Sequence, residues 1–171
     1  MFNMLLSSVL ALVSLVPPPT LKFDAPAGWV SKTPSSTMRI AEFTLPKVAG
    51  DPEDAELAVF FFGASGGGGV QANVDRWIGQ MDQPDGKASK DVAKTSTMTS
   101  HGLAITLVDV IGTYTAAMSP ATPVNKPNFR QIAAVVETTG GTYYVKLTGP
   151  AKTVAKWNES FITFMKSVRY E

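Results

Sequence analysis

The chain has 171 residues, a length that fits one domain. Its 15 basic and 14 acidic side chains nearly cancel, so it lacks the basic surplus with which proteins bind nucleic acid. It has no cysteine and one histidine, which excludes disulfides, thiolate nucleophiles and multi-histidine metal sites and leaves His101 as the one imidazole base.

Residues 1–19 differ from the rest of the chain. They carry no charge and 12 of the 19 are hydrophobic, whereas all 29 charged residues lie from Lys22 onward. The apolar run at 4–16 is shorter than the roughly 20 residues that span a bilayer and matches the apolar region of a secretory signal peptide. We therefore expect a signal peptide or N-terminal apolar leader over 1–19, and a single exported domain over 20–171, periplasmic or extracellular. An uncleaved anchor or a loose apolar tail is the alternative.

Three strands are predicted after the leader, over residues 21–26, 38–45 and 56–62. The third is apolar at both odd and even positions, which is typical of a strand covered on both faces. An acidic turn with Pro52 at its centre separates the second strand from the third.

A helix is predicted over 70–81, because apolar residues recur there at helical spacing. The stripe consists of Val70, Val74, Trp77, Ile78 and Met81. A turn at 82–86 follows, then a polar edge strand over 92–100. His101-Gly102 is expected to form a tight hairpin turn into a strand over 103–114.

The proline-rich segment 116–128 is predicted to be a loop. Residues 129–138 and 142–148 should form a hairpin around Thr139-Gly140-Gly141. A last helix is expected from Gly149-Pro150 to about Val168, since proline is tolerated in the first helical turn. Its apolar stripe consists of Val154, Trp157, Phe161, Phe164, Met165 and Val168.

The predicted order is thus β-β-β-α-β-β-β-β-α, with mostly hairpin connections. Hairpins produce antiparallel pairing, and two amphipathic helices with two-sided apolar strands suggest one helix on each face. The predicted fold class is α+β, an antiparallel sheet of six to seven strands flanked by two helices in an α/β/α sandwich.

Two segments resemble known proteins. Residues 23–29, FDAPAGW, resemble the opening of small exported bacterial domains of the PsbP-like superfamily. Residues 144–150, YVKLTGP, followed by Thr153-Val154 and the 161–167 segment, resemble a group of uncharacterised bacterial exported proteins. The resemblance implies a PsbP-like sandwich and an accessory or binding role. It carries over no catalytic residue, and members of a shared fold have unrelated functions.

Residues 63–67 spell G-x-S-x-G between a predicted strand and a predicted helix, the context of a hydrolase nucleophile elbow. Ser65 and His101 could form a triad with one of the intervening aspartates. The elbow, however, belongs to parallel sheets, and Gly68 and Gly69 lengthen the loop. A flexible connector is the preferred interpretation, and a small serine hydrolase is the alternative. The same glycine run could bind an anion at a helix N-terminus, although no Lys-Ser/Thr pair follows to make a P-loop.

The acidic turn could offer oxygen ligands to calcium, but Pro52 breaks the regular spacing that calcium loops require. Its members are Asp51, Glu53, Asp54 and Glu56. We expect a solvated turn, no metal site and no cofactor. Trp77 and Trp157 fall on buried helix stripes, whereas Trp29, Tyr144 and Lys146 remain candidates for a ligand-binding site.

The sequence therefore predicts an exported, non-enzymatic accessory or binding domain. Its partner would be a protein or a small molecule of the cell envelope, with no nucleic acid and no stable membrane span in the mature domain.

Overall fold

The frame of the protein is an antiparallel sheet of eight strands. The structure, a computed structural model, describes residues 19–116 and 124–171. The strand order is β2-β3-β4-β9-β8-β7-β5, and β6 also pairs with β7. The strands are β2 (Val30–Lys32), β3 (Arg39–Leu45), β4 (Ala55–Phe61), β5 (Met81–Asp82), β6 (Lys94–Ser100), β7 (Leu103–Tyr114), β8 (Lys126–Thr138) and β9 (Gly141–Pro150).

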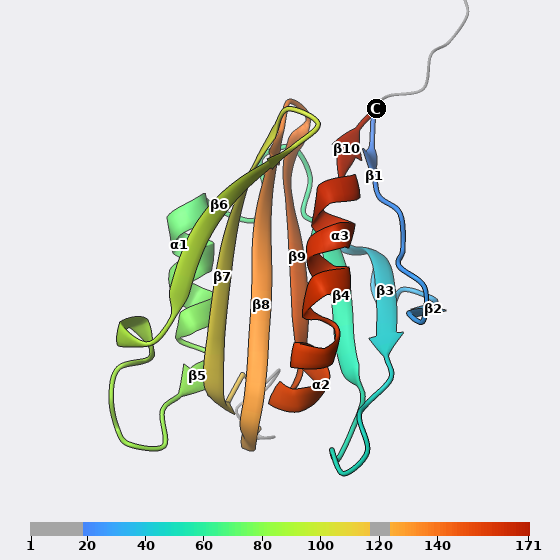
Figure 1. Cartoon of the computed structure of the whole chain (residues 1–171). Helices are drawn as coiled ribbons and strands as arrows, with labels where there is room; N and C mark the ends of the chain where they lie inside the picture. Colours follow the sequence, from blue (N-terminus) through green and yellow to red (C-terminus); the bar gives the residue numbers. More distant parts are fainter. Residues whose placement is uncertain (1–18, 117–123) are drawn as a thin grey trace, which may run out of the picture.

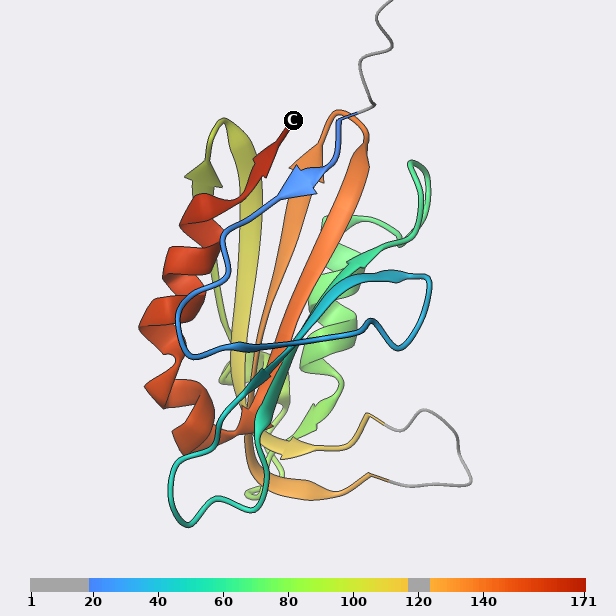
Figure 2. The same ribbon diagram turned by 90° about the vertical axis from the view of Figure 1, so that its right-hand side faces the viewer.

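Helices lie on both faces of this sheet (Figures 1 and 2). Helices α2 (Ala151–Lys156) and α3 (Asn158–Ser167) follow β9 on one face, and α1 (Val70–Ile78) lies on the other. A short 3₁₀ turn, η1 (Ser89–Asp91), follows β5. The predicted α+β class, with an antiparallel sheet between helices, is confirmed.

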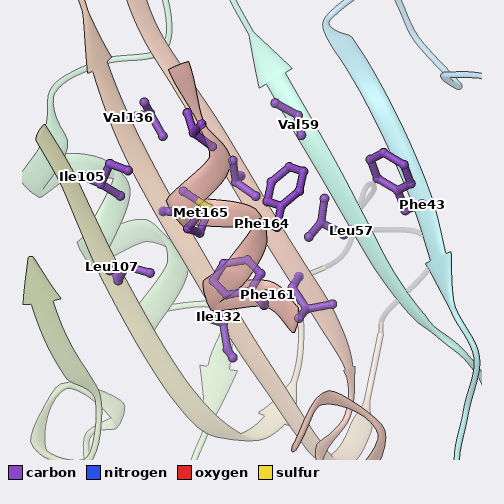
Figure 3. Packing of buried hydrophobic residues seen from close by; sticks show 14 of the residues in the cluster. Phe43, Leu57, Val59, Ile105, Leu107, Ile132, Val136, Phe161, Phe164 and Met165 are labelled. Atoms are coloured by element: carbon purple, nitrogen blue, oxygen red, sulfur yellow. The ribbon is translucent and has the colours of Figure 1, made fainter. Parts of the chain in front are cut away.

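The α3 face carries the larger part of the core. Strand alternation turns Leu57, Val59 and their neighbours toward α3, whose Phe161, Phe164 and Met165 are fully buried against them (Figure 3). Phe23 and Trp29, from the segment before β2, complete this cover. Their rings lie 5.0 and 5.2 Å from the ring of Phe164.

A second, two-stranded sheet joins the ends of the domain. Strand β1 (Leu21–Lys22) pairs antiparallel with β10 (Arg169–Tyr170). Two further backbone hydrogen bonds link Thr20 and Glu171, at 2.8 and 3.2 Å. The strand predicted at 21–26 therefore exists only as β1, and it lies outside the main sheet.

Other elements also differ from the prediction. Strands β2, β5 and β10 are too short, at two or three residues, to show a periodic pattern. Helix α1 ends at Ile78 before Gly79, which leaves Met81 to pair with Tyr114 as part of β5. Strand β8 begins at Lys126, inside the predicted loop.

The last helix is divided at Trp157, which takes φ −94° and ψ 3° between α2 and α3. Its indole Nε1 donates a hydrogen bond to the carbonyl of Pro46, 2.9 Å away. The predicted loop is described only at its two ends, and the predicted leader lies outside the described residues apart from Pro19. Within the described ranges, no helix is both long and apolar enough to cross a membrane.

Candidate functional site

The two faces of the sheet are covered unequally because two consecutive helices, α2 and α3, lie on one face and the single helix α1 lies on the other. Helix α1 has nine residues and extends about 14 Å, whereas the ten residues of β9 extend about 33 Å. Figure 2 shows the lower ends of β7 and β8 curving out of the sheet toward the side of α1. The part of this face next to those ends is left without a helix.

A pocket of about 490 Å³ occupies that part of the face. Its floor comes from β3, β4 and β9, and its far wall comes from the end of β7 and the start of β8. The lining residues are Arg39, Thr44, Glu53, Asp54, Ala55, Glu56, Ala58, Phe60, Tyr114, Lys126, Phe129, Lys146 and Thr148. Apolar and charged side chains therefore share one concave surface.

Lys146 is the central polar group of this pocket. Its Nζ donates hydrogen bonds to Gln80 Oε1 at 2.7 Å and to the Tyr114 hydroxyl at 3.0 Å, and it lies 5.0 Å from the centre of the Tyr114 ring. Among the described residues, no carboxylate lies within 4.0 Å of this ammonium group. Its two partners are neutral.

The surroundings disfavour the charged form of Lys146. Desolvation by burial, and then the positive charges of Arg76 and Arg39, lower its pKa to about 8, against a weaker opposing effect of Glu56. Burial also raises the pKa of Tyr114 above its ordinary value, so its hydroxyl stays protonated at neutral pH.

The other cations that line the pocket have carboxylate partners. Arg39 pairs with Glu42 at 2.6 Å and with Glu56 at 2.9 Å. Lys126 pairs with Glu53. Lys146 thus differs from Arg39 and Lys126 in having its charge uncompensated.

Thr148 adds a hydroxyl to the same surface. It lies two residues after Lys146 on β9, so both side chains face the pocket. Its Oγ1 is buried and has no hydrogen-bond partner among the described residues. Buried hydroxyls are usually bonded, so an unbonded one that lines a pocket is an available donor and acceptor.

A second hollow of about 610 Å³ shares Glu53, Lys126 and Phe129 with this pocket. It is larger, but its partly buried charged groups are already bonded. Asp51 accepts from Thr153, and Glu53 and Lys126 pair with each other. We therefore place the candidate site at the smaller pocket.

Glu42 stabilises the β2–β3 hairpin beside the pocket. It is only 1% exposed, and its carboxylate accepts hydrogen bonds from Ser35 and Arg39, both at 2.6 Å. Burial opposes ionisation, but these bonds and the Arg39 charge outweigh it, so the pKa of Glu42 lies below its ordinary value. The ionised form holds the loop and Arg39 in place.

Tyr144, one of the predicted ligand residues, supports the glycine-rich loop. Its side chain is 1% exposed, and its hydroxyl donates to the carbonyl of Gly68 at 2.8 Å. Asn73 Nδ2 donates to the carbonyls of Gly67 and Gly69 at 2.7 and 2.9 Å. Tyr144 on β9 and Asn73 on α1 therefore both hold the glycine-rich loop by hydrogen bonds to its carbonyl groups.

Trp29, Tyr144 and Lys146 are not brought together. Trp29 lies on the α3 face, where its Nε1 donates to Ser160 Oγ at 3.1 Å. Tyr144 and Lys146 point to the opposite face, and of the three only Lys146 lines the pocket.

Ser65 and His101 are not joined by a hydrogen bond in the described part of the chain. Ser65 is exposed in the turn after β4. His101 occupies the predicted β6–β7 turn with a φ of 47°, and its Nδ1 lies 3.2 Å from the carbonyl of Val168. The imidazole therefore contacts the end of α3.

The acidic residues before β4 have structural contacts. Asp51 accepts from the Thr153 backbone and hydroxyl, at 3.0 and 2.6 Å, and Asp54 accepts from the Lys47 backbone at 2.9 Å. No group of three or more potential metal ligands occurs within the described ranges.

Sequence reasoning missed Arg39 and Gln80, and it considered Tyr114 as a pocket aromatic without selecting it; these three residues complete the surroundings of Lys146. They come from three separate segments of the chain, so no local motif unites them. The one available signal was that Lys146 and Thr148 place polar groups on alternate positions of an otherwise apolar strand.

Comparisons with known proteins identify the fold alone. No protein-family model and no curated protein matches the chain. Among solved structures, LpqN of Mycobacterium tuberculosis, described as involved in cell envelope biogenesis, is similar with a TM-score of 0.52 and 12% identity, over 89% of this chain and 83% of LpqN. The two proteins therefore share a fold.

Two other similar structures have lower scores. A PsbP (CyanoP) from Synechocystis sp. PCC 6803 has a TM-score of 0.49 and 12% identity, over 96% of this chain and 98% of that chain. A protein of unknown function from Pseudomonas aeruginosa, PA94, has a TM-score of 0.46 and 13% identity, over 74% and 78% of the two chains.

Replacing Gly67 by alanine should destabilise the protein more than replacing Gly63. Both glycines have a φ of +87°, which costs any L-residue about 1–2 kcal/mol. A Cβ on Gly63 meets nothing within 4 Å, whereas one on Gly67 meets the buried ring of Tyr144, which adds about 1–3 kcal/mol. Urea unfolding of both variants measures the difference. Equal losses would show that Tyr144 does not restrain the loop.

Glu42→Gln should lower stability at pH 7 by about 1–3 kcal/mol, because it removes a charged acceptor from Ser35 and Arg39. Since the folded-state pKa of Glu42 lies below its ordinary value, its stabilisation is complete above pH 4.5 and lost as pH falls through that lower pKa. Stability of the variant should therefore depend less on pH in this acidic range. Urea titrations at pH 7 and pH 3 measure it, with the exposed Glu159→Gln as control. A difference no larger than that of the control would contradict the role of Glu42.

Proposed function

We propose that this chain is an exported, non-enzymatic binding domain whose pocket beside α1 holds a small amphipathic molecule. The observation that carries the proposal is the position of Lys146. It is a partly buried ammonium group that has no carboxylate partner among residues 19–116 and 124–171, in a pocket that also has apolar walls. Ligand pockets commonly combine apolar walls with a few polar groups of this kind.

The apolar part of the pocket is built from aromatic side chains. Phe129 stacks on Tyr114 with ring centroids 6.3 Å apart, and Phe60 lies under the guanidinium of Arg39 at 5.1 Å. Ala58 lies on the floor of the pocket, opposite Lys146 in the β4–β9 register. A flat or chain-like apolar group would replace water against these surfaces.

Of the residues predicted to bind a ligand, Lys146 is the one we assign to contact it. Tyr144 would act indirectly, by holding the loop that leads into α1. The geometry around Ser65 and His101 offers no support for the hydrolase alternative, because no hydrogen bond joins these two side chains among the described residues.

An uncharged aromatic probe tests the binding proposal. N-phenyl-1-naphthylamine, which fluoresces when it leaves water, should bind the wild-type protein in saturable fashion. Ala58→Leu places a larger side chain on the pocket floor and should weaken binding about tenfold, roughly 1.4 kcal/mol. Fluorescence titration measures the Kd.

The exposed Ala104→Leu on β7 makes the same substitution outside the pocket and should leave the Kd unchanged. Circular dichroism verifies that both variants are folded. Absence of saturable binding to the wild type, or equal Kd values for the wild type and a folded Ala58→Leu variant, would refute the pocket as a binding site.

Export is the second part of the proposal. The uncharged, apolar composition of residues 1–19 supports it, as does the fold shared with LpqN, a protein described as involved in cell envelope biogenesis. A C-terminally tagged protein should be recovered outside the cytoplasm, and Leu10→Arg, which places a charge in the apolar run, should retain it in the cytoplasm. Cell fractionation with immunoblotting distinguishes these results. A wild-type protein that stays cytosolic with Met1 intact would disprove export.

A further inference from the structure

We infer that the ligand of this pocket is an organic anion, with an oxyanion group paired to Lys146 and an apolar body against Phe60 and Phe129. The inference rests on the proposed function, since it specifies the chemistry of the molecule that the same pocket would bind. The shared chemistry is that of a carboxylate, phosphate ester or sulfonate on an apolar group.

Charge pairing in the pocket leaves one position for an anion. The cations Arg39 and Lys126 already have carboxylate partners, at Glu42, Glu56 and Glu53. In the part of the chain that the structure describes, Lys146 Nζ is hydrogen-bonded to the neutral oxygens of Gln80 and Tyr114 alone. A ligand oxyanion would therefore form a charge-assisted hydrogen bond without displacing an existing ion pair.

Two hydroxyl groups are placed to complete such a contact. The Tyr114 oxygen accepts from Lys146, and its own hydrogen has no acceptor among the described residues. The Thr148 hydroxyl, on the same face of β9, is buried and also without a partner in the described ranges. An oxyanion has several lone pairs, so it could accept from the ammonium and from both hydroxyls.

The charges that act on Lys146 also favour an anion. The positive charges of Arg76 on α1 and Arg39 on β3 disfavour the charged form of Lys146, Glu56 on β4 has the opposite effect, and Tyr114 on β7 stays neutral. An added negative charge would offset this repulsion and stabilise the protonated lysine. A cation at the same place would add to it.

A matched pair of probes tests the inference. The anionic probe 8-anilinonaphthalene-1-sulfonate differs from N-phenyl-1-naphthylamine by one sulfonate group. The wild-type protein should bind the sulfonate about tenfold more tightly than the neutral probe. Lys146→Met should abolish this difference in affinity between the two probes, and circular dichroism verifies that the variant is folded.

Three further variants test whether the preference for the sulfonate depends on the positive charge of Lys146 or on the overall positive charge of the protein. Lys146→Arg should keep the preference for the sulfonate. Lys126→Met, which removes a paired cation of the same pocket, and Lys166→Met, on the exposed side of α3, should both keep it as well. Retention of the preference in Lys146→Met, or its loss in Lys126→Met or Lys166→Met, would overturn the assignment to Lys146.

The pH dependence of the affinity for the sulfonate gives an independent readout, because the sulfonate itself does not titrate between pH 7 and pH 9.5. Since the pKa of Lys146 is about 8, the affinity of the wild type for the sulfonate should fall between pH 7 and pH 9.5. The Lys146→Met variant should show no such fall. Tyr114 does not contribute, because its pKa is raised.

Failure of the inference is distinguishable from failure of the proposed function. Saturable binding of the neutral probe that Ala58→Leu weakens, with no preference for the sulfonate, would overturn the anion assignment and leave the pocket established. Displacement of the bound sulfonate by decanoate or by decyl phosphate, but not by decanol, would support an oxyanion and indicate which source fits. Equal displacement by decanol would also overturn the assignment.

Discussion

The structure depends on one constraint, which is that a sheet with long central strands must be shielded from water by two consecutive helices on one face and a single short helix on the other. On one face, α2 and α3 together with Phe23 and Trp29 cover the apolar residues of β4, β9 and β8. On the other face, α1 is too short to do so. The residues beyond the end of α1 on that face are a mixture of apolar and charged side chains, and the pocket forms there.

The unequal cover explains why a charged group can lie in the middle of an otherwise apolar strand. At the α3 face, the alternate residues of β9 are Tyr143, Val145 and Leu147, all buried. At the opposite face, Lys146 and Thr148 take the place of apolar residues, since no helix stripe lies over them. The cost of partial burial for Lys146 is limited by Gln80 and Tyr114, which supply hydrogen bonds but no compensating charge.

The sequence was sufficient for the elements whose pattern is local. Helical spacing identified the buried faces of α1 and α3, and the turn at His101-Gly102 and the strand over 103–114 were predicted at their observed positions. Strands β2, β5 and β10 could not be found, because two or three residues contain no period. The site could not be predicted for a related reason. Arg39, Tyr114 and Lys146 come together through the order of the strands in the sheet, and of the three only Lys146 was selected from the sequence. Trp29 is a residue type that often contacts ligands, but its side chain lies on the α3 face of the sheet, away from the pocket.

The pairing of β1 with β10 brings the two ends of the domain to one corner (Figure 1). The curved ends of β7 and β8, which form the wall of the pocket, lie at the opposite end of the sheet. A surface or a fused protein attached through residues before Thr20 would consequently be separated from the pocket by the length of the sheet. Either terminus could then be immobilised without blocking access, and both would present the domain in the same orientation.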